Sequence, residues 1–305
     1  MNKNIKILIA AGGTGGHVIP GYNLAIDLAE KNFEVKLITD NRGYKFLKEK
    51  KKIDIMILPS FPFKSKNLFE KLFSLILIFF SSFRSLFFLV FNRPTLIFGM
   101  GGYASFPICI SAKILNIKFI IYENNLIIGK ANRYLLPFAS KIFVSNKSLN
   151  GINSKYRYKI CEIGNILNKQ IINFFDNNID NKIVEKINIL VLGGSQAAKV
   201  FAEKLPIIFE KCKRQKIPLK IFQHCLPKQN EELTLFYKKN KIDFEIFNFN
   251  YDLINYFSRV NIAITRSGSS VLAELTNANI PFIAIPLPTS SDNHQLKNAI
   301  FYENK

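Results

Sequence analysis

Short apolar segments alternate with longer, amphipathic segments along the first half of the chain. Continuous apolar runs are typical of strands buried on both faces, and parallel strands need a helix to connect each one to the next. The pattern therefore predicts a parallel sheet covered by helices. Its strands are expected at residues 5–10, 34–39, 53–58, 95–98, 119–122 and 141–144, and its first helix at residues 22–30.

The alternation stops at residues 165–186, which are rich in Asn and charged side chains, and then starts again. Strands are expected in the second half at residues 187–192, 219–222, 244–247, 261–265 and 282–285. We predict an α/β protein with two doubly wound, Rossmann-like domains, residues 1–164 and 187–305, joined by the linker 165–186. Open α/β sheets bind ligands at the carboxyl ends of their strands, so two such edges facing across a cleft would suit a donor and an acceptor.

A glycine-rich stretch follows the first predicted strand and reads AAGGTGGHVIPG at residues 10–21. Glycines let the backbone turn tightly and approach a bulky anion, and the N–H groups that begin the next helix attract negative charge. The stretch lacks the Gly-Lys-Ser/Thr ending of a P-loop, and Val18 stands where the dinucleotide fingerprint needs its third glycine. Asp40, at the end of the second strand, keeps a ribose-binding role open. We predict a phosphate or diphosphate site, with a ligand-free glycine turn as the alternative.

The most apolar stretch is Leu68–Phe91, which Arg84 and several serines interrupt. Its length suits a membrane span, but a central Arg is expensive in lipid, and the stretch lies between two strands of one sheet. Two interpretations remain. The helix is buried on several faces, or its Phe and Leu side chains enter a bilayer interface with help from Lys64, Lys66 and Lys71. We favour the second, because an outer helix should have a polar face and this one is apolar nearly all round.

The net charge of +20 fits nucleic acid, an anionic membrane or an acidic substrate. No aromatic RNA-binding signature or basic recognition helix supports nucleic acid. The four cysteines are scattered, and no signal peptide is visible, so we expect an intracellular protein with free thiols. Neither a metal site nor a cofactor is predicted, because the sequence has no Asp-x-Asp motif and no His/Cys cluster.

Polar residues and glycines follow several other predicted strands. GMGGY occupies residues 99–103, and Glu123, Asn124 and Asn125 end the next strand, although a turn rich in Asn would explain that last group equally well. In the second half, RSGSS at residues 266–270 precedes Glu274, which could bind ribose hydroxyls.

In this order, the motifs resemble the MurG family of peptidoglycan glycosyltransferases. The likeness covers GGTGGH at residues 12–17, GGY at 101–103, ENN at 123–125, GGSQ at 193–196, RSG at 266–268 and HQ at 294–295. The resemblance implies the GT-B architecture and an inverting, metal-independent reaction. In that reaction N-acetylglucosamine passes from UDP-N-acetylglucosamine to the muramoyl 4-hydroxyl of undecaprenyl-diphospho-MurNAc-pentapeptide, which converts lipid I to lipid II.

The resemblance also implies roles for individual residues. His17 and Glu123 are the catalytic candidates, with His17 suited to take the proton of the acceptor hydroxyl. The substrate-binding candidates are Thr14, Gly15 and Gly16 on the diphosphate loop, Asn125, Ser195 and Asn250, then Ser269, Ser270, Val271, Leu272, Ala273 and Glu274 on the sugar nucleotide, and Gln295 on the sugar hydroxyls.

The family further implies a peripheral protein on the cytoplasmic face of the inner membrane, which it touches through Leu68–Phe91. Two departures from the family pattern stand out. The family's Gly-Asn-Pro-x-Arg reads GNILN at residues 164–168, so Asn168 replaces a phosphate-contacting Arg, and the chain stops at Lys305, before the expected C-terminal helices. The rival hypotheses are another GT-B enzyme, such as a sugar-nucleotide epimerase, and a degenerate UDP-sugar-binding protein without turnover.

Overall fold

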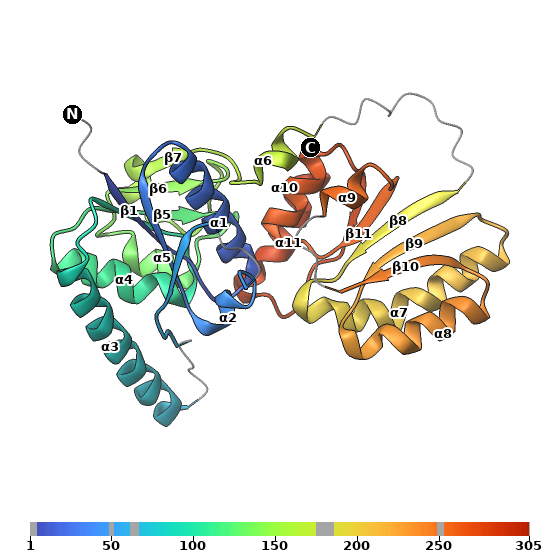
Figure 1. The fold of residues 1–305 in the computed structure, drawn as a ribbon, viewed down its shortest axis with the longest axis horizontal. Coiled ribbons are helices and arrows are strands. Elements are labelled where there is room, and N and C mark those ends of the chain that lie inside the picture. The colour runs from blue at the N-terminus through green and yellow to red at the C-terminus, as the bar shows by residue number, and fades with distance from the viewer. Residues whose placement is uncertain (1–4, 49–51, 62–66, 175–185, 249–252, 305) are drawn as a thin grey trace. The chain divides into compact units, whose positions relative to one another are not determined.

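A computed structural model describes residues 5–48, 52–61, 67–174, 186–248 and 253–304. The chain divides into two compact units, Met1–Ile166 and Leu167–Lys305, and each is described by itself. Figure 1 shows that each unit is built on a sheet flanked by helices. All strand pairs are parallel, so the predicted fold class of two doubly wound α/β domains is confirmed.

The first unit has a seven-stranded sheet in the order β3-β2-β1-β4-β5-β6-β7. All six strands predicted for this half are present, and β7 is an addition whose exposed Cys161 and Glu162 gave no apolar run to detect. Its elements are β1 (Lys6–Ala10), α1 (Gly15–Glu30), β2 (Glu34–Thr39), α2 (Asn41–Tyr44), β3 (Asp54–Ile57), α3 (Leu68–Phe91), β4 (Leu96–Gly99), α4 (Gly102–Ile114), β5 (Phe119–Glu123), α5 (Lys130–Leu135), β6 (Lys141–Val144), the 3-10 helix η1 (Ser154–Lys159) and β7 (Ile160–Glu162).

The second unit has a five-stranded sheet in the order β10-β9-β8-β11-β12, and all five predicted strands are present. Its elements are α6 (Lys169–Ile172), β8 (Ile187–Leu192), α7 (Gly194–Arg214), β9 (Leu219–His224), the 3-10 helix η2 (Pro227–Gln229), α8 (Asn230–Lys239), β10 (Asp243–Phe247), α9 (Ile254–Phe257), β11 (Ile262–Thr265), α10 (Ser269–Asn277), β12 (Phe282–Ala284), the 3-10 helix η3 (Ser291–Asn293) and α11 (His294–Glu303).

The described part of the predicted linker 165–186 contains α6. Leu167 and Ile171 are buried in the core of the second unit, and the side-chain amide of Asn277 donates to the Ile171 carbonyl at 2.6 Å. Asn168, which stands where the family has an Arg, caps α6 by accepting from the Gln170 N–H at 2.9 Å. This segment therefore begins the second unit as a packed, capped turn of helix.

Helix α1 begins at Gly15, whereas the sequence predicted its start at residue 22. Glycine and proline are poor helix formers, so residues 15–21 gave no helical signal. Pro20 lacks an N–H and cannot bond to the carbonyl four residues before it, which belongs to Gly16. That carbonyl instead accepts a hydrogen bond from the Asn124 side-chain amide at 3.0 Å. A contact from the end of β5 thus supports the glycine-rich first turn.

Helix α3 has serines on its buried side and most of its large apolar residues outside, while Phe88 and Leu89 near its end pack into the core. Its buried positions include Ser74, Ser81 and Ser85, and the Ser111 hydroxyl of α4 donates to the Ser82 carbonyl at 2.8 Å. Small side chains let two helices approach closely. The large exposed side chains are Leu68, Phe69, Leu72, Phe73, Leu75, Ile76, Phe79, Phe80, Phe83, Phe87, Val90 and Phe91.

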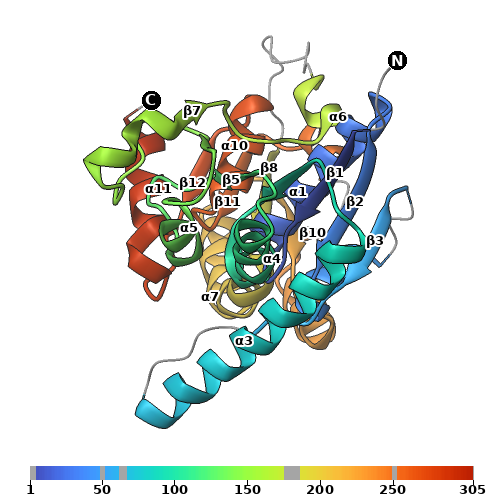
Figure 2. The same cartoon turned by 90° about the vertical axis from the view of Figure 1, so that its left-hand side faces the viewer.

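This arrangement decides between the two interpretations of α3. Within the described residues, α3 is the one helix long and apolar enough to cross a membrane, yet only 22% of its most apolar window is buried. Figure 2 shows that it extends well away from the helices beside it. The interpretation that α3 is buried on several faces is therefore wrong, because its buried positions are three serines with Phe88 and Leu89 near its end, and its other phenylalanines are exposed.

The first prediction concerns Lys159, whose ammonium group is buried and donates to three carbonyls beyond the end of α5. The acceptors are the carbonyls of Leu136, Pro137 and Ala139, at 3.1, 2.9 and 2.6 Å. Unpaired buried carbonyls are costly, so Lys159→Met is expected to lower the free energy of unfolding by roughly 1–3 kcal/mol. The exposed Lys155→Met in the same 3-10 helix is the control for denaturant titration. Equal stability of the two variants would contradict this role.

Candidate active site

In each unit, two neighbouring strands lead their following loops to opposite faces of the sheet. Ala10 of β1 pairs with Gly99 of β4, and Leu192 of β8 pairs with Thr265 of β11. At each pair the strand order reverses, and open α/β sheets bind ligands at this point, outside the carboxyl ends of the strands. All four loops that follow these strands contain glycine. Each unit therefore carries one candidate binding edge.

The first loop turns tightly before α1. A Cβ on Gly12 would lie 2.4 Å from the Cβ of Ala104, and Gly13 has a φ of +84°, so neither position favours a side chain. Thr14 is the N-cap of α1 without a side-chain cap bond, and Gly15 and Gly16 form the first turn. Backbone N–H groups at the start of a helix lack partners within the helix and attract anions. Thr14, Gly15 and Gly16 thus lie where a diphosphate can approach backbone donors.

His17, in the same turn, lies against the loop that follows β4. Gly101 and Gly102 have φ values of +86° and +73°, and a Cβ on Gly101 would lie 3.1 Å from both Nδ1 and Cε1 of the imidazole. The same Cβ would lie 3.4 Å from the side-chain nitrogen of Asn132. The absence of side chains at Gly101 and Gly102 therefore leaves room for the His17 imidazole. The imidazole is partly exposed, so it can contact a ligand at this edge.

Glu123, the second catalytic candidate, is 2% exposed and saturated with hydrogen bonds. One carboxylate oxygen accepts from the Gly129 N–H at 2.8 Å and from Asn132 at 3.0 Å, and the other accepts from the backbone and side chain of Asn125 at 3.2 and 3.0 Å. Through these contacts Glu123 fixes the loop between β5 and α5. A catalytic role for it stays a prediction.

The end of β5 meets the glycine loop through two asparagines. Asn124 donates to the Gly16 carbonyl, and the Asn125 side chain donates to Asn124 at 3.1 Å. The structure therefore brings Asn125 and Glu123 to the edge that holds Thr14, Gly15, Gly16 and His17. These residues come from two separate parts of the sequence.

Asp40 lies beside the same loop, and its carboxylate is already engaged. One oxygen accepts from the N–H groups of Gly13 and Gly43, both at 2.8 Å, and the other accepts from Nε and Nη2 of Arg42 at 2.8 and 2.6 Å. Burial would raise the pKa of Asp40, but these hydrogen bonds and the charge of Arg42 lower the pKa overall. These contacts already occupy both carboxylate oxygens of Asp40, so a ribose-binding role for it stays a prediction, and Arg42 is a neighbour that the sequence did not indicate.

The candidates of the second unit lie mainly on α10. Ser269, Leu272 and Ala273 are buried, so Leu272 and Ala273 can offer a ligand only their backbone. Ser270, Val271 and Glu274 are partly exposed on the same helix. Ser195 begins α7, with its side chain outside the described part, and Asn250 lies wholly outside the described residues.

Glu274 and Gln295 are held in defined environments. Burial raises the pKa of Glu274 to about 7. The Gln295 side chain accepts from the Leu287 N–H at 2.9 Å, which ties α11 to the segment after β12. Strongly shifted pKa values are common at functional sites, although buried structural groups can show them too.

Arg266 and Asn298 organise the loop after β11. The Arg266 guanidinium donates to the Ile285 and Pro286 carbonyls at 3.2 and 3.1 Å, and Asn298 donates to the Ser267 carbonyl at 3.1 Å. The Ser267 hydroxyl is fully buried and has no partner within the described residues. The RSG motif that carried the family likeness thus positions the backbone before α10.

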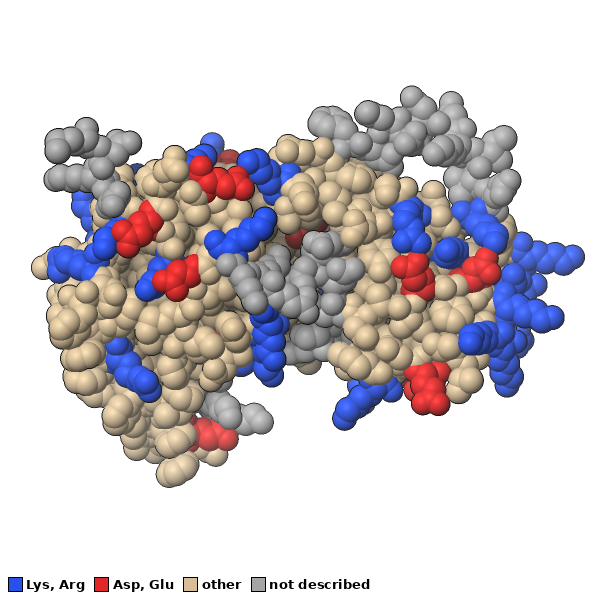
Figure 3. All heavy atoms as spheres, in the orientation of Figure 1, with Lys and Arg blue, Asp and Glu red and all other residues tan. Residues whose placement is uncertain are grey.

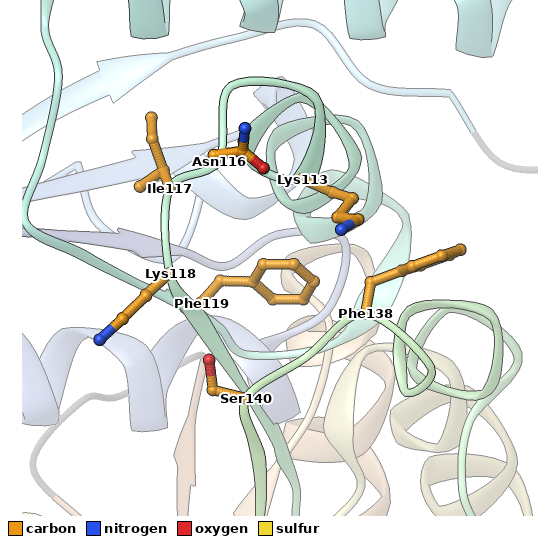
Figure 4. A pocket seen from close by; sticks show the side chains of 7 residues that line it. All are labelled: Lys113, Asn116, Ile117, Lys118, Phe119, Phe138 and Ser140. Atoms are coloured by element: carbon orange, nitrogen blue, oxygen red, sulfur yellow. The ribbon is translucent and has the colours of Figure 1, made fainter.

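One cavity and the main cluster of basic side chains lie away from these two edges. A cavity of about 180 Å³, lined by Lys113, Lys118 and Phe138 among others, sits where β5 and β6 begin (Figure 4). Figure 3 shows Lys and Arg gathered on the second unit near the ends of α7 and α8, also at the amino edge of its sheet. Within the described residues, no group of three or more His, Cys, Asp or Glu side chains could hold a metal ion.

Two Rossmann-like units, each with glycine loops at its strand-order reversal, define the class of GT-B glycosyltransferases. Residues 7–144 match the N-terminal domain of glycosyltransferase family 28 and residues 188–305 match its C-terminal domain, so the chain belongs to that family.

Curated relatives agree with this assignment. A protein of Pelagibacter ubique is 40% identical over 99% of this chain and 82% of its own length, and one of Rickettsia canadensis is 32% identical over 98% and 83%. Both are named UDP-N-acetylglucosamine–N-acetylmuramyl-(pentapeptide) pyrophosphoryl-undecaprenol N-acetylglucosamine transferase. The predicted resemblance to this group of transferases is confirmed.

Solved structures support the fold. The crystal structure of Acinetobacter baumannii MurG matches with a TM-score of 0.72 and 23% identity over 98% of this chain and 83% of that one. A UDP co-structure of S. aureus MnaA matches with a TM-score of 0.63 and 15% identity over 98% and 87%. Both likenesses concern the architecture.

The second prediction follows from the pKa of Glu274. Between its ordinary value of 4.5 and about 7, folded Glu274 keeps a proton that the unfolded chain has lost, so its burial costs stability as pH rises through this range. Glu274→Gln removes that cost. The melting temperature of the variant, relative to the native protein, is expected to be higher at pH 8 than at pH 5.

Thermal unfolding at both pH values checks this expectation. The exposed Glu231→Gln, in the first turn of α8, controls for the loss of a carboxylate. The same relative melting temperature for Glu274→Gln at pH 5 and pH 8 would show that burial of this carboxyl does not favour its neutral form.

Proposed function

We propose that this protein transfers N-acetylglucosamine from UDP-N-acetylglucosamine to the muramoyl 4-hydroxyl of a lipid-linked diphospho-MurNAc-pentapeptide. The observation that carries the proposal is the placement of His17 in the glycine-rich first turn of α1, against Gly101 and Gly102. A proton acceptor and a row of backbone N–H donors then lie at one edge. A hydroxyl nucleophile attached to a diphosphate needs both. The activity named for the 40% identical relative supports the same reaction.

The acceptor belongs to the first unit in this proposal. Its diphosphate lies on the N–H groups of Gly15 and Gly16 beside Thr14, whose own N–H donates to the Gly12 carbonyl at 3.2 Å, and this places the sugar hydroxyl toward His17. His17 takes the hydroxyl proton as the oxygen attacks, and Asn125 completes the edge. The Glu123 hydrogen bonds keep the β5–α5 loop in place during this step.

The donor belongs to the second unit. The UDP group lies along the loops after β8 and β11 and the start of α10, from Ser269 to Glu274, with the Glu274 carboxyl group hydrogen-bonding to the ribose hydroxyls. Ser195 and Asn250 are assigned to the same nucleotide, and Gln295 to the sugar. As the new glycosidic bond forms at C1, the bond from C1 to the UDP oxygen breaks and the configuration inverts. Helix N-termini stabilise the charge that develops on UDP, so no metal is required.

The third prediction tests the reaction itself. Labelled N-acetylglucosamine is expected to pass from UDP to a short-chain acceptor analogue in the presence of EDTA. His17→Ala is expected to lower kcat by about 10²–10⁴-fold, the usual contribution of a general base, while UDP binding measured by calorimetry stays the same.

Each result separates the rival hypotheses. Unchanged turnover in His17→Ala would reject His17 as the base. UDP binding without any transfer by the native protein would favour a degenerate UDP-sugar-binding protein. Turnover that EDTA abolishes would contradict the metal-independent mechanism.

We also propose that α3 places the protein on the cytoplasmic face of the inner membrane as a peripheral protein. The support is the exposed apolar surface of α3, which at about 1.5 Å per residue is long enough to lie along an interface rather than touch it at one point. Arg84 is exposed in the middle of this surface, and lipid would oppose its complete burial. A helix lying in the interface satisfies both features.

The fourth prediction tests this surface. Replacing Phe73, Phe80 and Phe87 together with Ser is expected to lower partitioning onto anionic phospholipid vesicles at least tenfold, because each loses apolar contact with lipid. Turnover of a water-soluble acceptor analogue should not change. Ile207→Ser with Ile208→Ser, at exposed positions of α7, controls for the loss of apolar surface. Equal vesicle binding by both variants would contradict the proposal.

A further inference from the structure

A second cavity of the first unit lies beside the glycine loop and has no part in the mechanism above. Its volume is about 230 Å³, and it is lined by Asp40, Asn41 and Arg42 on one side and by Pro59, Ser60 and Phe61 on the other. Binding pockets for whole small molecules usually measure about 300–1,000 Å³. This cavity therefore suits one part of a larger ligand.

Arg42 is held at the wall of this cavity in a fixed orientation. Its Nε and Nη2 both donate to one oxygen of Asp40, and Asp40 is only 2% exposed. The Ser60 hydroxyl donates to the same oxygen at 3.3 Å, which joins the two walls. A guanidinium fixed in this way loses little further freedom when it binds an anion.

The same guanidinium keeps donors for a ligand. Its side chain is 44% exposed, and among the residues that the structure describes Nη1 has no hydrogen-bond partner. Since Asp40 neutralises only one edge of the planar fork, the other edge can face a carboxylate or phosphate. Pro59 and Phe61 add apolar surface next to that edge.

The cavity is also tied to the diphosphate loop. A Cβ on Gly13 would lie 3.8 Å from Nη2 of Arg42, and the Gly13 N–H donates to Asp40 at 2.8 Å. Asp40 therefore fixes the loop and Arg42 with one carboxylate. An acceptor whose diphosphate lies on Thr14 to Gly16 would extend its neighbouring groups past this wall.

We infer that the cavity is an acceptor subsite in which Arg42 binds an anionic group, a carboxylate or a phosphate, with Asp40 as its positioning residue. The inference rests on the proposed function. The acceptor offers both kinds of anion, because the relatives' name describes a peptide-bearing sugar joined to a pyrophosphate. Arg42 thereby sets acceptor affinity and not the chemical step.

The test compares steady-state constants of the full chain and of Arg42→Gln, Arg42→Lys and Phe61→Ala, with a short-chain, peptide-bearing acceptor analogue. Arg42→Gln is expected to raise the KM for the acceptor about tenfold, with kcat and the KM for UDP-N-acetylglucosamine unchanged. Arg42→Lys should give a smaller rise, because an ammonium keeps the charge and loses the fork. Phe61→Ala should raise the acceptor KM without altering the Asp40 contacts. The exposed Arg157→Gln in η1 controls for the loss of one positive charge.

A second arm identifies the anion. Inhibition by a short-chain prenyl diphosphate, which has no sugar or peptide, is measured on the same variants. If Arg42→Gln weakens this inhibitor as much as it weakens the acceptor, Arg42 binds a phosphate. If the inhibitor is unaffected while the acceptor KM rises, Arg42 binds a carboxylate of the peptide arm.

Two outcomes would overturn the inference, and they are distinguishable. Normal turnover with an unchanged acceptor KM in both Arg42→Gln and Phe61→Ala would remove the subsite and leave the proposed function intact. Absence of transfer by the native protein would contradict the proposed function and the subsite with it.

Discussion

The parallel pairing of β1 with β4, and of β8 with β11, decides where each unit can bind a ligand. The two strands of each pair are hydrogen-bonded neighbours, yet the chain leaves them toward opposite faces of the sheet. The loops that follow the two strands must then diverge, and the backbone N–H groups of these loops lie at the carboxyl edge of the sheet. Because Gly12 and Gly101 in the first unit and Gly193 in the second have no side chain, the backbone is accessible at both edges. The functional residues are placed around that one constraint.

Local pattern was enough to predict every strand except β7, because a strand buried on both faces must be apolar throughout. It was not enough for features that depend on distant residues. The start of α1 relies on Asn124, which follows Gly16 by 108 positions. The Asp40–Arg42 pair is linked to the glycine loop only through the hydrogen bond from the Gly13 N–H to Asp40, which the sequence does not reveal. Motifs indicated Glu123 as important, but its saturated hydrogen bonds became visible only in three dimensions.

Helix α3 shows why hydropathy alone leaves burial open. Its composition would serve equally well in a core, in a bilayer or at an interface, because an average over residues ignores direction. What distinguishes the cases is the position of the serines, which lie along the buried stripe and leave every phenylalanine of α3 except Phe88 exposed. An exposed apolar surface of this extent is typical of a site that contacts a membrane or another protein.

Pro20 has a consequence for how this site can change during evolution. The Gly16 carbonyl receives no helical hydrogen bond from residue 20, because residue 20 is a proline without an N–H, and Asn124 donates to it instead. A mutation of Pro20 to any other residue would supply a local donor, and Asn124 would then compete with the helix for one acceptor. The effects of substitutions at positions 20 and 124 are therefore expected to be non-additive. A substitution at one position therefore changes what the other position can tolerate, although Pro20 lies within α1 and Asn124 follows β5.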